Sequence, residues 1–173
     1  MYGGTAESFL GIPGFREHCN EALAIARWAD PTIYAVVVMF KYVCIAAGVY
    51  LPDDTALRDT ADALELAERS GEPVPLAAAW LARGVTLVHR GGPESTPGYD
   101  LLAKTRAMAL SHQFPGVGVP IVDIHTAQRM ARTTDIGGAI RAGPPVTSRM
   151  CLCLHAIYPA HGGGPQACVC IRS

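Results

Sequence analysis

The sequence predicts an all-α fold in which antiparallel helix pairs stack as a fragment of a solenoid over residues 13–142. Three observations carry this prediction: explicit helix start and stop signals, an amphipathic pattern with helical period, and a repeat of roughly 40–45 residues. A short segment, 1–12, precedes this domain. An irregular tail, 143–173, follows it.

The first two helices are predicted by proline and aspartate. Pro13 suits the first turn of a helix through FREHCNEALAIARWA. Asp30 followed by Pro31 is an N-cap with proline at the first helical position. It predicts a second helix through TIYAVVVMFKYVCIAAG, with Gly48 at its end.

A third helix is predicted from the cap at Asp53 and Asp54 to a stop at Gly71. We expect one apolar stripe on it, made by Leu57, Ala61, Leu64 and Ala67. We expect the polar side chains to face elsewhere, namely Asp59, Asp62, Glu65 and Arg69.

Four further helices complete the predicted domain. They cover about 74–89, 98–112 and 120–133, and a last one begins at Asp135. Alternate helices start at a period of roughly 40–45 residues, typical of two-helix repeats. The segment EALAIARWADP at 21–31 is echoed by DALELAERSGEP at 62–73. An irregular helical bundle is the alternative, and it is all-α as well.

The second predicted helix could also be interpreted as a membrane-spanning segment. Residues 33–51 carry a single charge, Lys41, and are nearly long enough to span a bilayer. A charge at the midpoint costs about 2.5–3.5 kcal/mol on insertion scales. A helix that is buried between two neighbouring helices is also apolar on all its sides. We therefore predict a buried helix and no membrane contact.

The residues predict no catalytic site and no cofactor. There is no phosphate-binding G-x-x-x-x-G-K-[ST] loop, and neither Ser70 nor Ser111 lies in a G-x-S-x-G elbow. Asp123 and His125 are two positions apart on a helix, so they point in different directions. We expect His125 to be a packed or capped surface histidine. The chain is predicted not to be an enzyme.

Two other groups have structural interpretations. His89 and Arg90 precede Gly91 at a predicted helix end, where cationic side chains suit the negative end of the dipole. Cys19 and Cys44 fall on apolar helical faces, so we expect buried thiols.

Charge divides the chain near position 136. All fifteen acidic residues lie at or before Asp135, so residues 1–135 carry a net charge of −4 and the rest +3. The overall charge of −1 gives no reason to expect nucleic-acid binding. The N-terminus has no basic and apolar signal pattern, so we expect a cytoplasmic protein with reduced cysteines.

Three long stretches of the chain are ADPTIYAVVVMFKYVCIAAGVYLPDDTALRDTADALELAERSGE, LARGVTLVHRGGPESTPGYDLLAKTRAMAL and VPIVDIHTAQRMARTTDIGGAI. Together they resemble the C-terminal TPR-like repeat region of mycobacterial multidomain regulators. Such regulators join an adenylate or guanylate cyclase domain, a P-loop ATPase module and TPR-like repeats, sometimes with a LuxR-type helix-turn-helix.

The resemblance implies a TPR-like solenoid that acts as a sensory or partner-binding arm in signalling. It carries no catalytic residue to this chain, because the family's metal-binding aspartates and P-loop lie in domains absent from the sequence. The resemblance stops at DIGGAIRAG, which implies a truncated fragment.

The tail holds the only candidate metal ligands: Cys151, Cys153, His155, His161, Cys168 and Cys170. Their C-x-C spacing differs from the usual zinc knuckle, and a disulfide clasp would need an oxidising compartment. A shifted reading frame in a GC-rich gene also yields few acids and many Ala, Gly, Pro, Arg, Cys and His residues. We favour this third interpretation, so no bound metal is predicted.

Three functions remain open. The first is a non-catalytic helical-repeat module that binds a protein partner or a small effector. The second is a degenerate gene remnant without independent function. The third, least favoured, is a Cys/His zinc-binding module.

Overall fold

The computed structural model describes residues 14–132, and within this range it contains helices and no strands. The all-α prediction is therefore confirmed. The α-helices are α2 (Phe15–Ala29), α3 (Pro31–Val43), α4 (Asp54–Ser70), α5 (Pro73–Arg90), α6 (Ser95–Leu110) and α7 (Gly118–Arg132). Two short 3-10 helices join them, η1 (Cys44–Ala47) after α3 and η2 (Gly92–Glu94) before α6.

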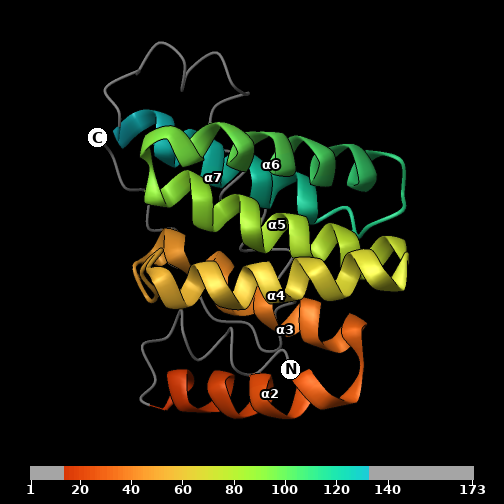
Figure 1. The fold of residues 1–173 in the computed structure, drawn as a ribbon. Coiled ribbons are helices and arrows are strands. Elements are labelled where there is room, and N and C mark those ends of the chain that lie inside the picture. Colours follow the sequence, from red (N-terminus) through yellow and green to blue (C-terminus); the bar gives the residue numbers. More distant parts are fainter. Residues whose placement is uncertain (1–13, 133–173) are drawn as a thin grey trace, which may run out of the picture.

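Each helix packs against the next one along the chain, and the connections are short. Neighbouring helices are therefore antiparallel. Figure 1 shows the stack running from α2 at one edge, through α3, α4 and α5, to α6 and α7 at the other edge. Alternate helices also meet, because α5 packs against both α3 and α7. The assignment to a particular repeat type stays a prediction.

The helix ends follow the sequence signals closely. The Asp30 carboxylate accepts hydrogen bonds from the backbone N–H groups of Thr32 and Ile33, at 2.7 and 3.2 Å. The Asp53 carboxylate accepts one from Ala56 at 2.9 Å. These bonds satisfy donors that the first turn of a helix leaves unpaired.

Two glycines end helices with a left-handed backbone that other residues avoid. Gly48 has a φ of 73° after η1, and Gly71 has a φ of 70° after α4. Both stops were predicted from the sequence. Pro13 and the helix predicted from Asp135 lie outside the described residues, as does the whole tail.

The core follows α3 and α5, which supply most of its buried apolar side chains. Ala77, Ala78 and Ala79 on α5 are fully buried, and these small side chains let the neighbouring helices approach closely. The prediction that the second helix is buried agrees with this. Within residues 14–132, no helix combines the length and apolar character needed to cross a membrane.

The apolar stripe predicted on α4 is correct at Ala67, but its other members lie one position away from the buried side. Ala61 is exposed, and the buried side is formed by Ala56, Thr60, Ala63 and Ala67. The reason is that α4 packs between α3 and α5. The line of small residues on α4 is the side that contacts these two helices. Leu57 and Leu64 lie half-buried beside that line.

Candidate functional site

The first candidate site is an exposed apolar patch on α2. Trp28 is 88% exposed and Ile25 is 72% exposed, which places them among the three most exposed large apolar side chains of residues 14–132. Residues three, four and seven positions apart share one side of a helix. We call this side the α2 outer face; it comprises Glu17, Glu21, Ala24, Ile25 and Trp28, all exposed.

The opposite side of α2 explains why this face stays open. Phe15 and Ala26 are buried, and Ala22 and Leu23 pack half-buried against the core. Ala22, Leu23 and Ala26 pack with the core on the side of α3, the main neighbour of α2, and Phe15 packs against the ring of Tyr50. Among the described residues, no helix is seated on the other side, so α2 carries apolar side chains on both of its sides.

A second candidate is a small groove of about 240 Å³ between α6 and α7. It is lined by Tyr99, Leu102, Ala103, Arg106, Val122, Asp123 and Thr126. Arg106 Nε donates to Asp123 Oδ1 at 3.1 Å. This ion pair joins the two helices, so the two charges in the groove already neutralise each other.

His89 and His125 form a buried pair between α5 and α7. His89 Nε2 lies 3.0 Å from His125 Nδ1, and the rings meet edge to face with centroids 5.1 Å apart. Burial, together with the positive charges of Arg132 and Arg129, lowers the pKa of His89 to about 4. Burial and then His89 lower the pKa of His125 to about 3. Both imidazoles are therefore neutral at pH 7.

This result corrects two predictions. His89 was expected to be a cationic side chain at a helix end, but burial keeps it neutral, and Arg90 alone carries the charge there. His125 is packed, as one of the two expectations had it, but only 2% of it is exposed, so it is no surface histidine. The pairing could not be predicted from the sequence, because the two residues are 36 positions apart.

The sequence predicted that Asp123 and His125 point in different directions, and the structure agrees. Asp123 faces Arg106 on α6, whereas His125 faces His89 on α5. A general base and its orienting carboxylate must contact each other. These two residues instead make separate contacts between helices.

A buried polar cluster links α3 to α4. Lys41 Nζ lies 3.1 Å from Asp59 Oδ2, and the Tyr42 hydroxyl donates to the same oxygen. The Lys41 ammonium also lies over the rings of Tyr42 and Tyr50, at 5.0 and 5.6 Å from their centroids. Burial and the Asp59 carboxylate raise the pKa of Tyr42. Asp59 was expected to lie off the apolar stripe of α4, and it pairs with Lys41, the one charged residue of α3.

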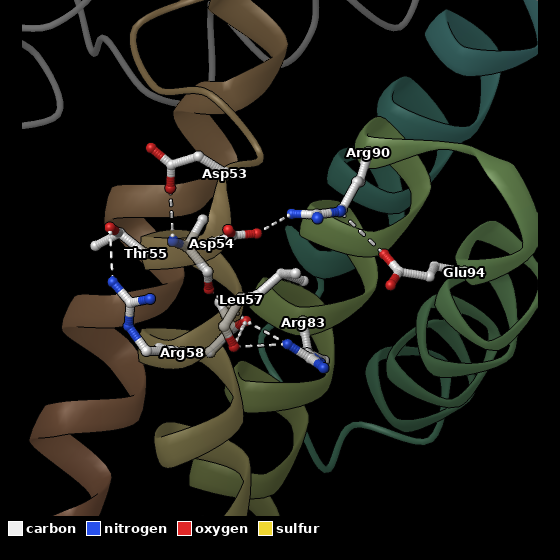
Figure 2. A network of polar contacts seen from close by, with 10 residues as sticks. Asp53, Asp54, Thr55, Leu57, Arg58, Arg83, Arg90 and Glu94 are labelled. Carbon is white, nitrogen blue, oxygen red and sulfur yellow. Dashed lines mark hydrogen bonds and ion pairs between the residues drawn. The ribbon is translucent and has the colours of Figure 1, made fainter.

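Two arginines of α5, Arg83 and Arg90, form a row of polar contacts along α4, which we call the polar seam. Figure 2 shows it from close by. Arg83 donates to the backbone oxygen of Leu57 at 2.7 Å. Arg90 bridges Asp54 on α4 at 2.8 Å and Glu94 of η2 at 3.2 Å. The basic groups here are occupied by contacts within the chain, so the seam has a structural role.

The two cysteines of the described range differ from each other. Cys44 is buried as expected, and its thiol donates to the Phe40 backbone oxygen at 3.4 Å. Cys19 is only half-buried. Residues 14–132 contain no group of three His, Cys, Asp or Glu side chains that could hold a metal ion. The six Cys and His candidates of the tail lie outside the described residues.

Comparison of the chain with protein-family models, with curated proteins and with solved structures finds no match.

Proposed function

We propose that this chain is a non-catalytic helical-repeat module that binds a protein partner through the α2 outer face. The observation that carries the proposal is the exposure of Trp28 beside Ile25 on that face. Exposed aromatic side chains next to other apolar groups are enriched at protein interfaces.

The occupant we propose is an amphipathic helix with basic side chains. In this stack, α2 and its neighbours already pack against other helices. Glu17 and Glu21 lie on the same side of α2 as Trp28. Their carboxylates would select lysine or arginine beside the partner's apolar stripe.

A signalling role as the TPR-like arm of a larger regulator is part of the same proposal. It rests on the resemblance of residues 15–142 to that region and on the order of helix packing. The polar side chains that the sequence singled out support a non-catalytic role, since Asp123 and His125 are each used in a contact between helices.

The test uses Trp28 fluorescence in a Trp80→Phe variant, which leaves one tryptophan in the chain. The probes are model amphipathic helical peptides made of leucine with lysine, and of leucine with glutamate. We expect the lysine peptide to shift Trp28 emission to the blue and to protect it from acrylamide, because the ring leaves water. We expect the glutamate peptide to do neither.

The matched control is Leu110, which is 58% exposed on α6. Ile25→Ser should abolish the blue shift, whereas Leu110→Ser should preserve it. Equal responses to both peptides, or an equal effect of both variants, would contradict the proposed surface.

A further inference from the structure

We propose that the hydrogen bond between His89 and His125 is an acid-sensitive latch that holds α7 on α5 while both imidazoles are neutral and releases it as the pair takes up protons. The proposal rests on the 3.0 Å contact and on the burial of both rings, with His89 only 9% exposed. It concerns the C-terminal side of the stack and is independent of the α2 outer face.

The contacts of the pair indicate which nitrogen carries the proton. His89 Nδ1 is buried and has no hydrogen-bond partner within the described part of the chain. An unpaired N–H is rarer in a protein interior than an unpaired acceptor. We therefore infer that His89 Nδ1 holds a lone pair and that His89 Nε2–H donates to His125 Nδ1.

Protonation weakens this arrangement in two steps. The first proton creates a buried cation, which burial disfavours. The second proton leaves two N–H groups 3.0 Å apart, with no acceptor between the two rings. The pair therefore stabilises the α5–α7 contact most when both rings are neutral, and the second proton removes the hydrogen bond itself.

The surrounding charges add to this effect. On α7, the charges of Arg129 and Arg132 both disfavour a proton on His89. On α6, Tyr99 is a neutral phenol whose pKa burial raises. Among residues 14–132, no acidic side chain contributes to the pKa shift of either histidine.

Charged residues on the other neighbouring elements are already occupied. Arg90, next to His89 in the chain, is bound by Asp54 of α4 and Glu94 of η2. Lys41 is the one charged residue of α3, and it is paired with Asp59.

The direction of the pH effect follows from the lowered pKa values. A histidine in the unfolded chain has a pKa of 6.5, so the unfolded state binds more protons than the folded state between pH 6.5 and about 4. The stability that the neutral pair contributes is therefore fully present above pH 6.5 and is lost as the pH falls towards 4. Between pH 7 and 5, each histidine lowers the folding equilibrium constant by roughly 20-fold.

The central test compares the full chain with the double variant His89→Gln/His125→Asn. The glutamine amide can donate where Nε2–H stands, and the asparagine oxygen can accept where Nδ1 stands, but neither side chain titrates. We expect the wild-type folding constant to fall roughly 400-fold more than that of the variant between pH 7 and 5, because the variant removes both titrating rings. Parallel profiles would overturn the proposal.

NMR of the wild type supplies a second measurement that does not depend on a variant folding. We expect imidazole ¹⁵N shifts to report both rings neutral at pH 6, and the α7 amide signals to change at a higher pH than those of α3. Simultaneous change of α3 and α7, or a ring protonated at pH 6, would contradict the latch. The variant His112→Asn, at an exposed turn position, should behave as wild type.

Discussion

At the scale of single residues, Lys41 shows how a charge is accommodated within an apolar helix. Its ammonium is nearly buried, contacts Asp59, and lies over two tyrosine rings. Each contact offsets part of the cost of removing the charge from water. The sequence indicated only that a charge stood in the middle of an apolar run, since its partner belongs to the next helix.

We predict that Asp59→Asn lowers the free energy of unfolding by about 3 kcal/mol, because it leaves a buried ammonium without a counter-charge. Chemical denaturation of the full chain measures this. Asp62→Asn is the matched control, since Asp62 forms an exposed pair with Arg27. It should cost less than about 1 kcal/mol. Equal losses of unfolding free energy for both variants would show that the buried pair contributes no more than the exposed one.

The helix ends show which residue-level signals are sufficient on their own. Asp30 and Asp53 bond to backbone groups two or three residues away, so both caps could be predicted from local sequence. His89 could not be read in this way. Its neutral state depends on burial in the folded chain, which sequence position alone does not indicate.

At the scale of elements, α5 and α6 cross closely at two glycines. A Cβ atom added at Gly98 would lie 2.9 Å from Leu87 Cβ and 3.0 Å from the Val88 backbone nitrogen. A Cβ atom added at Gly84 would lie 2.9 Å from Leu102. Glycine is therefore required at this crossing because the two backbones approach closely.

We predict that Gly98→Ala destabilises the chain by about 1–3 kcal/mol through overpacking, although alanine is the better helix former. A thermal melt detects the loss. Gly116→Ala is the control, because a Cβ atom there meets nothing within 4 Å. A melting temperature of Gly98→Ala equal to that of wild type would refute the close crossing.

The elements also show why α4 was only partly predicted. Its bounds follow from local caps, but its buried side depends on where α3 and α5 lie. The pattern of apolar residues fits two neighbouring lines along the helix equally well. Contact with two helices selects the line of small side chains, Ala56, Thr60, Ala63 and Ala67.

At the scale of the whole molecule, the helical class and the order of the helices could be predicted from periodicity and caps. The α2 outer face was missed, because the first helix was judged by its boundaries alone. The signal was present in the sequence: Ile25 and Trp28 are three residues apart, on the side opposite to Phe15 and Ala26. The His89–His125 pair needed the three-dimensional arrangement.

We predict that truncation after Gly143 leaves the thermal melt of the chain unchanged and that the full chain holds no stoichiometric metal. The basis is the sequence of the tail, which lacks acids and zinc-knuckle spacing. Thermal melts with and without a chelator, together with elemental analysis, measure both. One zinc per chain, with a loss of stability on truncation or chelation, would revive the metal site at the tail cysteines.

The most direct test of the binding role is hydrogen–deuterium exchange of the full chain with and without the leucine–lysine peptide. Our account predicts new protection concentrated in Phe15–Ala29, because α2 carries the proposed surface. It also predicts that Ile25→Ser removes this protection. Protection in the α6–α7 groove instead of α2, or no protection at peptide concentrations that shift Trp28 emission, would contradict it.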